Sequence, residues 1–264
     1  MTPPVTPPVT HPLSVFLITR NEEARLGRTL DAVAWADQVV VVDSGSRDAT
    51  CEIARAKGAE VHHRDWTGYG AQKSYAEGLC RNDWVLNIDA DEVVTPELAA
   101  EIRAFLATNS APAAFRVRVR NVYPGDDRPR PFASDYNIVR FYHRAAGSYR
   151  NHPLFDRVEL EEGIVLGQLK APIHHFAHLS LAHFIDKENR YTSYVAETAR
   201  PRSRLWLMLR LPFELPLAFL KFYFLRGHIT GGWKGFAFAT AAAFMRMIRI
   251  AKLLEVADQQ RRKD

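Results

Sequence analysis

The sequence predicts an α/β fold built on a mostly parallel sheet with flanking helices. Short apolar segments alternate with helical segments through the first half of the chain, and no linker separates them. Strands that alternate with helices of about 10–15 residues are typical of right-handed βαβ units. With 264 residues, 47% of them hydrophobic and 25% charged, the chain is long enough for one large domain with an appendage.

The individual elements follow from periodicity and from residues that begin or end helices. The run LSVFLIT and the β-branched run QVVVVDS are typical of buried strands, whereas EEARLGRTLDAVAWA has helical periodicity. Gly58 suits a helix end, and Pro96 suits a first helical turn. The predicted strands are 13–19, 38–44, 59–64 and 83–89, and the helices that follow them are 22–36, 47–58, 70–80 and 96–108.

The second half of the chain changes character twice. Residues 113–123 and 136–144 alternate apolar and polar side chains, which indicates half-buried antiparallel strands, and a helical pattern returns over 178–199. Residues 200–264 then hold 13 Lys+Arg and 4 Asp+Glu, a net charge of +9. We therefore expect a disordered Pro-rich tail over 1–12, a catalytic domain over 13–199 and a basic amphipathic helical region over 200–264. Only two cysteines occur, which favours a reducing compartment.

Polar residues gather where three of the predicted strands end. In open α/β sheets, ligands bind outside the carboxyl ends of the strands, so three such clusters predict a site there. The clusters are Thr19, Asn21 and Glu22 after the first strand, Asp43, Ser44 and Ser46 after the second, and Asp89 and Asp91 after the fourth.

The Asp89–Ala90–Asp91 sequence is suited to a divalent cation. Alternate residues that leave a strand can converge on one ion, and Mg²⁺ or Mn²⁺ prefers oxygen ligands and shares its shell with substrate phosphates. The alternative is a solvated acidic turn that caps the helix beginning near Pro96.

Several motifs together resemble the family 2 glycosyltransferases, which have a GT-A fold. They are SVFLITRNEEARLGRTL, VVVVDSGSRDAT, QKSYAEGL and DWVLNIDADE. The resemblance is greatest to the branch similar to lipopolysaccharide-core glucosyltransferases, and it extends to PIHHFAHLSLAHFIDKENRYTSYVAE and FYFLRGHITGGWKGFAFA. It thus spans nearly everything from residue 13 onward.

The resemblance implies a role for each candidate residue. Thr19, Asn21 and Glu22 would line the nucleotide pocket, with Asp43 near the base and Ser44 where many members have a second acid. Lys73 would face the diphosphate of a nucleotide sugar, UDP-sugar being favoured. Asp89 would lie near the ribose and metal, Asp91 would be the main metal ligand, and His175 could approach the diphosphate or pack structurally.

The resemblance also implies an inverting reaction that needs a general base. The stretch HPLFDRVEL is similar to the family's segment that contains the base, which places Asp156 in that role, with Glu159 as the second candidate. The other reading is that Asp156 only pairs with Arg157 or another neighbour. The acceptor would be a hydroxyl of a lipid-linked or lipopolysaccharide-core-type envelope glycan.

The basic C-terminal region is rich in Leu, Phe and Trp with interspersed Arg and Lys. Its longest uncharged run is 235–245, and Pro212 and Pro216 break the stretch before it, so we expect interfacial amphipathic helices on an anionic membrane rather than a spanning helix. The protein would be cytoplasmic and peripheral on the inner membrane. A helical flap or dimer interface is the alternative, and no motif supports nucleic-acid binding.

Three other function classes share parts of these patterns. A haloacid-dehalogenase-like phosphatase also carries an Asp-X-Asp after a strand, but after the first strand of its core. A sugar nucleotidyltransferase would need a Gly-rich, basic loop after the first strand, where TRNEEARLG is acidic. A membrane-bound nucleotide-binding module without catalysis is the third.

Overall fold

The computed structural model describes residues 11–108, 112–133, 135–152, 156–199 and 203–261. Most of the expected tail over 1–12 therefore lies outside the described residues. The chain divides into two compact units, Met1–Arg120 with Asp135–Phe176, and Asn121–Ser134 with Ala177–Asp264. The second unit also takes in residues before 200, the boundary expected from charge, because helix 181–198 packs along the last helix, Gly232–Arg261.

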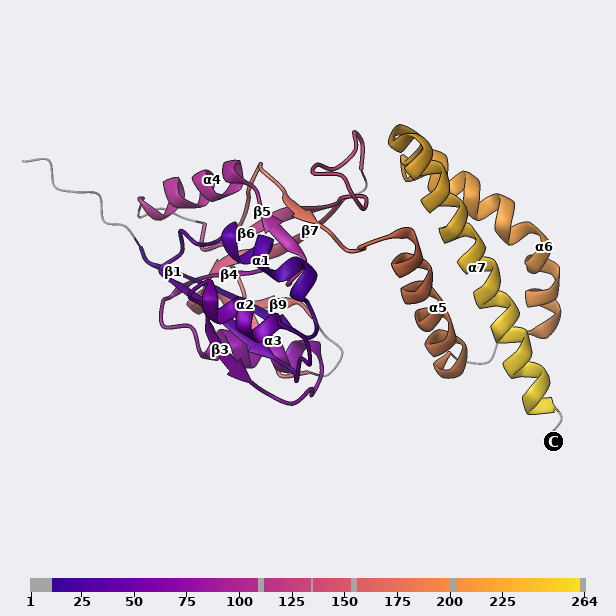
Figure 1. Cartoon of the computed structure of the whole chain (residues 1–264), viewed down its shortest axis with the longest axis horizontal. Coiled ribbons are helices and arrows are strands. Elements are labelled where there is room, and N and C mark those ends of the chain that lie inside the picture. The colour runs from indigo at the N-terminus through magenta and orange to yellow at the C-terminus, as the bar shows by residue number, and fades with distance from the viewer. Residues whose placement is uncertain (1–10, 109–111, 134, 153–155, 200–202, 262–264) are drawn as a thin grey trace, which may run out of the picture. The chain divides into compact units, whose positions relative to one another are not determined.

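The first unit contains all of the described strands and four helices (Figure 1). The strands are β1 Leu13–Thr19, β2 Gln38–Asp43, β3 Glu60–His63, β4 Trp84–Asn87, β5 Glu92–Val94, β6 Ala114–Asn121, β7 Asp135–His143, β8 Gly147–Tyr149, β9 Val158–Leu160, β10 Leu166–Gln168 and β11 Ile173–His175. The helices are α1 Glu23–Asp31, α2 Thr50–Ala56, α3 Tyr69–Gly78 and α4 Pro96–Leu106, with a 3-10 turn over Arg144–Ala146.

The main sheet joins a parallel half to an antiparallel half. Its order is β3-β2-β1-β4-β7-β6-β11-β5, with β10 paired to β6, while β8 and β9 form a separate ribbon. Strands β3, β2, β1 and β4 are parallel, as the alternating segments predict. Strand β7 then runs antiparallel to both β4 and β6, as the period-two pattern predicts. The α/β fold class is confirmed, and the parallel strands are confined to one half of the sheet and its β6–β10 pair.

Helices cover the two faces of this sheet and bury its apolar side chains. Helices α1, α2 and α4 contribute to the larger core cluster, and α3 with β8 contributes to a second one on Phe16, Val40 and Val42. The strands end where these apolar runs end, which leaves the polar residues that follow β1, β2 and β4 at one edge of the sheet.

The second unit is helical, with α7 lying between α5 and α6 (Figure 1). Its elements are α5 Leu181–Thr198, α6 Arg204–Leu220, a π-helical segment Lys221–Leu225, a 3-10 turn His228–Gly231 and α7 Gly232–Arg261. Glu214 of α6 accepts hydrogen bonds from Arg210 and from Arg246 of α7, each at 2.6 Å. The sequence-based expectation that Pro212 and Pro216 interrupt this stretch is wrong, because α6 continues through both while it packs along α7.

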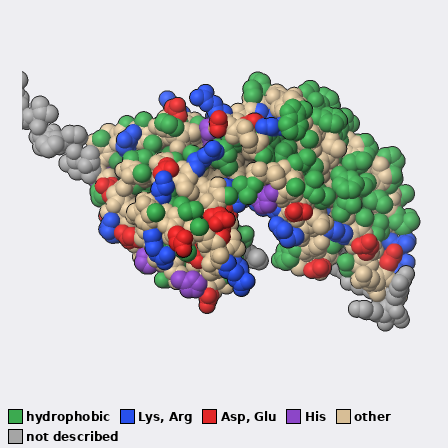
Figure 2. Space-filling model, in the orientation of Figure 1, with side chains coloured by type: hydrophobic (Ala, Val, Ile, Leu, Met, Phe, Trp, Pro, Cys, Tyr) green, Lys and Arg blue, Asp and Glu red, His purple; other side chains and the backbone are tan. Residues whose placement is uncertain are grey.

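Large apolar side chains are exposed over α6 and the start of α7, where Figure 2 shows hydrophobic side chains gathered. Across the described part of the chain, no helix combines the length and apolar character that crossing a bilayer requires.

Candidate functional site

The turn that follows β4 is held by Glu92 rather than left to solvent. The Asp89 amide donates to the Glu92 carboxylate at 2.9 Å, and the Glu92 amide donates to the Asp89 carbonyl at 2.9 Å. Glu92 begins β5 and its side chain is fully buried. The helix cap of α4 is Thr95, whose hydroxyl accepts from the Leu98 amide. The carboxylates of this stretch are therefore not a helix cap.

Arg140 of β7 neutralises two of these carboxylates at once. Its Nη2 atom lies 2.8 Å from Asp89 and 2.8 Å from Glu92, and its Nη1 donates to the Asn87 side chain. The antiparallel pairing of β4 with β7 brings Arg140 to this position. Only 2% of the Arg140 side chain is exposed, so the charge is compensated inside the protein.

Lys73 of α3 connects Asp89 to the candidate base. Its Nζ atom lies 2.9 Å from Asp89 Oδ1 and 2.8 Å from Asp156 Oδ1, although Asp156 is far from both residues in the sequence. The Lys73 side chain is buried, whereas 38% of the Asp156 side chain is exposed. Glu159, the second candidate base, pairs with Arg150 instead.

Asp91 and His175 form the other arm of the site. His175 Nε2 lies 3.3 Å from Asp91 Oδ1, and Arg25 Nη1 lies 3.3 Å from Asp91 Oδ2. The pairing of β11 with β5 brings His175 here, where its Nδ1 is 3.2 Å from the Tyr136 hydroxyl. That hydroxyl also lies 3.5 Å from Glu92, which pairs with Arg140. Polar contacts therefore run from Asp91 through these groups, Asp89 and Lys73 to Asp156.

The electrostatics of this network follow from burial and from the partners. Burial alone would raise the pKa of Asp89, but the charges of Arg140 and Lys73 outweigh it and hold that pKa well below its usual range. Burial would also raise the pKa of Asp91, and the hydrogen bond from His175 reverses the shift and lowers it. Burial raises the pKa of Glu92 in spite of Arg140. Asp89 and Asp91 are therefore ionised at neutral pH and can bind cationic groups.

The candidate residues after β1 and β2 build two linked turns. The Asp43 carboxylate accepts from the Gly45 and Ser46 amides, each at 2.8 Å, and from the Ser46 hydroxyl. Asn21, at a positive φ of 55°, donates its amide to the Ser46 hydroxyl and accepts from the Arg47 amide. These contacts join the ends of β1 and β2 into one surface.

Thr19, Ser44 and Glu22 complete that surface. Within the described residues the buried Thr19 hydroxyl has no hydrogen-bond partner, which leaves it available to a ligand. The Ser44 hydroxyl accepts from Gln72 at 2.9 Å. Glu22 binds Arg25, which in turn contacts Asp91, so this cluster adjoins the carboxylates that follow β4.

The donor set around Asp91 fits a divalent cation that the substrate completes. Among the described residues no group of three His, Cys, Asp or Glu side chains could hold a metal by itself. Asp91 and His175 offer an oxygen and a nitrogen, and Mg²⁺ commonly takes one or two protein carboxylates with phosphates and water supplying the rest. Both oxygens of Asp89 already contact cationic side chains.

Sequence reasoning did not identify Arg140, Tyr136 or Arg25. Arg140 and Tyr136 belong to an alternating strand whose polar positions are typical of a solvent face, and only strand pairing places them beside the carboxylates. Arg25 lies in the amphipathic segment after the first strand, where a helical arginine is ordinary. The one available signal was the excess of carboxylates over cations at the end of β4, which requires buried positive partners.

Comparison with known proteins identifies relatives along nearly the whole chain. The family model described as "Glycosyl transferase family 2" matches residues 14–160. An uncharacterized glycosyltransferase of Rickettsia typhi is 35% identical over 94% of this chain and 89% of that protein. The lipopolysaccharide core biosynthesis glycosyltransferase LpsC of Rhizobium meliloti is 29% identical over 92% of each. Among solved structures, S. aureus TarS 1-349 is 16% identical, with a TM-score of 0.47 over 96% of this chain and 92% of that one.

Proposed function

This chain belongs to the family 2 glycosyltransferases, and we propose that it moves a sugar from a nucleoside-diphosphate sugar to a hydroxyl of an envelope glycan, with inversion. We favour a UDP-sugar as donor. The lipopolysaccharide core assignment of LpsC, which is similar over 92% of both chains, supports a lipid-linked or lipopolysaccharide-core-type acceptor.

One observation carries the proposal: Lys73 joins Asp156 to Asp89. The exposed carboxylate that we assign as the base thereby lies one buried lysine away from the strand-end carboxylates. A donor whose diphosphate lies near Lys73 would have its anomeric carbon within the same neighbourhood as Asp156. The geometry thus favours Asp156 over Glu159, which contacts Arg150 outside this network.

We assign the remaining residues from their positions at the sheet edge. Thr19, Asn21, Glu22, Asp43 and Ser44 would form the nucleotide pocket. The Thr19 hydroxyl, which has no hydrogen-bond partner in the part of the chain that the structure describes, would be a direct contact. Asp43 acts largely by holding the turn over 43–46, which sets the shape of that pocket. Lys73 would bind the diphosphate and oppose the negative charge that grows on it during departure.

The reaction is then a single displacement. The acceptor oxygen bonds to the anomeric carbon while the bond from that carbon to the diphosphate oxygen breaks, and a carboxylate oxygen of Asp156 takes the hydroxyl proton. The nucleoside diphosphate leaves with the bonding electron pair. Because attack and departure occur on opposite faces of the sugar, the anomeric configuration inverts.

Asp91 and His175 would hold Mg²⁺ or Mn²⁺ together with the donor diphosphate. When bound, the cation supplies charge stabilisation for the leaving group. Arg25 would balance the Asp91 charge in the free protein. Asp89 would have to exchange an ion pair with Lys73 or Arg140 before it could bind a cation, so we place it second to Asp91.

We also propose that α6 lies in the surface of an anionic membrane, on the cytoplasmic face of the inner membrane. Several of its most exposed apolar side chains recur every three or four residues and so share one helix face, and the exposed Lys221 and Arg226 follow that face. An apolar stripe followed by cations matches the boundary between acyl chains and anionic headgroups. The stripe comprises Leu205, Leu209, Phe213, Leu217 and Leu220 of α6, and Phe224 of the π-helical segment continues it.

Phosphatase and nucleotidyltransferase chemistry are not favoured. The family match covers the segment from β1 to β9 that carries every residue of the site except His175. In addition, the Asp-X-Asp sequence follows β4, in the middle of the sheet order, rather than the first strand of the chain.

The decisive experiment compares Asp156→Asn with the matched change Glu159→Gln. We expect Asp156→Asn to lower kcat by about 10²–10⁴-fold with donor affinity within a few-fold of wild type, because Lys73 retains Asp89 as a partner. Transfer from a panel of UDP- and GDP-sugars to core-type glycolipids gives kcat, and thermal shift gives donor binding. Near-normal turnover in Asp156→Asn, or an equal loss in Glu159→Gln, contradicts the assignment.

A further inference from the structure

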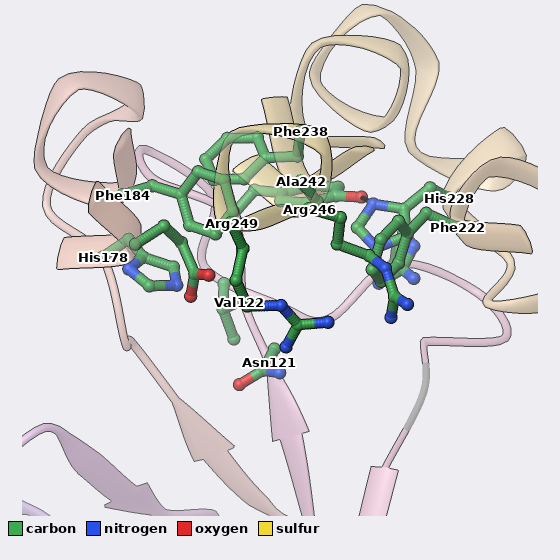
Figure 3. Close-up of a pocket in the computed structure, with 13 residues that line it drawn as sticks. Asn121, Val122, His178, Phe184, Phe222, His228, Phe238, Ala242, Arg246 and Arg249 are labelled. Carbon is green, nitrogen blue, oxygen red and sulfur yellow. Dashed lines mark hydrogen bonds between the residues drawn. The ribbon is translucent and has the colours of Figure 1, made fainter. Parts of the chain in front are cut away.

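The second unit contains a cavity of about 320 Å³ that the proposed reaction does not use. All of its lining residues belong to this unit, and they come from residues 121–130, His178 just before α5, α5 itself, the segment 222–228 and α7. Figure 3 shows His178 and Phe184 on one side, Phe222 and His228 on the opposite side, and Arg246 and Arg249 extending from α7. A volume of this size suits a small polar group with part of an attached chain.

The cavity has more positive charge than nearby acids balance. Among the described residues, Arg249 has neither an ion pair nor a hydrogen bond, and Arg130 donates only to the carbonyls of residues 226 and 227, at 2.8 and 3.1 Å. Arg246 contributes a third guanidinium, paired with Glu214 at 2.6 Å. The half-buried Glu188 is the only acid on the wall formed by the described residues.

Burial and the excess positive charge shift the pKa values of neighbouring groups. Burial, with the charges of Arg130 and Arg226, lowers the pKa of His228 to about 4. Burial and the charge of Arg246 lower the pKa of Arg249. A bound anion would relieve this repulsion, and guanidinium groups suit the several oxygens of a phosphate because their planar N–H donors can make two bonds at once.

Part of the wall is aromatic, and one of its elements continues into exposed apolar residues. Phe184 and Phe238 pack with ring centroids 5.2 Å apart, and Phe222 lines the opposite side. Phe222 lies in the π-helical segment Lys221–Leu225, whose Phe224 and Leu225 are 53% and 83% exposed. A ligand with both a phosphate and an apolar chain would match the guanidinium groups and the phenylalanine rings of this wall.

We infer that this cavity binds the headgroup phosphate of an anionic phospholipid, with Arg249 and Arg130 on the phosphate and the phenylalanines against the adjoining chain. The inference rests on the membrane association proposed above and gives it a specific lipid contact. It does not depend on sugar transfer. Inorganic phosphate could bind the same guanidinium groups, so the test distinguishes a phospholipid headgroup from free phosphate.

The test measures binding to the full-length protein by isothermal titration calorimetry. The probes are dihexanoyl phosphatidylglycerol, dihexanoyl phosphatidylcholine and inorganic phosphate, the lipids below their micelle concentrations. We expect saturable 1:1 binding of phosphatidylglycerol, with inorganic phosphate and phosphatidylcholine each at least about tenfold weaker. Comparable affinity for inorganic phosphate or for phosphatidylcholine overturns the inference, since the cavity would then be a free-anion site or an apolar site.

Two variants assign the binding to the cavity. Arg249→Gln removes a cation that has no partner in the described structure, so we expect the fold to persist and phosphatidylglycerol to bind at least about tenfold more weakly. Ala242→Leu fills the cavity without changing charge and should weaken binding too, while Arg261→Gln, at the exposed end of α7, should not. Unchanged affinity in both cavity variants overturns the inference. Donor-induced thermal shifts, recorded in parallel, report separately on the transferase proposal.

Discussion

The guanidinium of Arg140 and the carboxylate of Glu92 lie 2.8 Å apart, and neither side chain is more than 2% exposed. This pair anchors the turn that carries Asp89 and Asp91, because Glu92 also accepts the Asp89 amide. Removing one member of a buried pair leaves the other charge uncompensated, which is far more costly than losing a surface ion pair.

Arg140→Met should therefore destabilise the first unit by about 3–5 kcal/mol. The substitution leaves Glu92 buried and removes one cation from Asp89, so the turn loses its anchor as well as its charge balance. Urea unfolding followed by circular dichroism measures the loss, and hydrogen–deuterium exchange of β4 and β7 locates it. Glu162→Gln, at an exposed turn of the same unit, is the control and should change stability by less than about 0.5 kcal/mol. A variant as stable as this control would show that the pair does not anchor the turn.

Asp91→Asn should abolish the metal-dependent part of donor binding. Asp91 and His175 are the two protein groups that we assign to the cation, so the amide should weaken binding of UDP-glucose with Mn²⁺ by at least about tenfold. Thermal shift with UDP-glucose, with and without Mn²⁺, measures this. Asp83→Asn, an exposed residue just before β4, provides the matched control. If Asp91→Asn keeps the full Mn²⁺-dependent shift, the cation binds elsewhere.

How far the sequence could predict this site is clear from Asp89 and Arg140. The strands that end at Thr19 and Asp43 match their predicted runs closely, because a continuous apolar segment bounded by polar residues is a local signal. Asp89 could be placed at a strand end for the same reason. Its partner Arg140 could not be identified, since it is 51 residues away and reaches Asp89 only through the β4–β7 pairing.

The second unit also contains helix positions that local sequence patterns did not predict. Pro212 and Pro216 are strong local signals against a helix, yet α6 runs through both because packing along α7 and the Glu214 bridges hold it. Helix α1 ends at Asp31, earlier than its periodicity suggests, although Val33 is still buried in the core. Tertiary contacts determine where these helices continue or end, and a local sequence pattern carries no information about those contacts.

Acidification should destabilise the second unit through His228. Its Nδ1 lies 2.6 Å from the Tyr123 hydroxyl, and burial lowers its pKa from 6.5 to about 4. Between those values the unfolded chain takes up a proton that the folded chain excludes, so stability is complete above about pH 6.5 and falls toward pH 4. We expect a loss on the order of 2 kcal/mol over that range.

Unfolding curves of wild type and His228→Gln at pH 7 and pH 4.5 test this. The variant should lose less stability on acidification than wild type, whereas His62→Gln in the first unit should follow wild type. Hydrogen–deuterium exchange of α7 assigns the effect to the second unit. A pH dependence in His228→Gln equal to that of wild type would exclude this histidine as its source.

Replacing Leu209, Phe213 and Leu217 together with Ser should release the protein from anionic membranes. These side chains are 61–64% exposed, so the folded unit loses little packing when they are removed. Full burial of each in an acyl boundary is worth about 1.5–3 kcal/mol, and losing all three should lower partitioning at least about a hundredfold. Flotation with phosphatidylglycerol-containing vesicles measures partitioning, and Val165→Ser, which removes a 72% exposed side chain from the first unit, is the control. If the triple variant floats like wild type, α6 is not the membrane contact, and its apolar face must be covered by a protein surface instead.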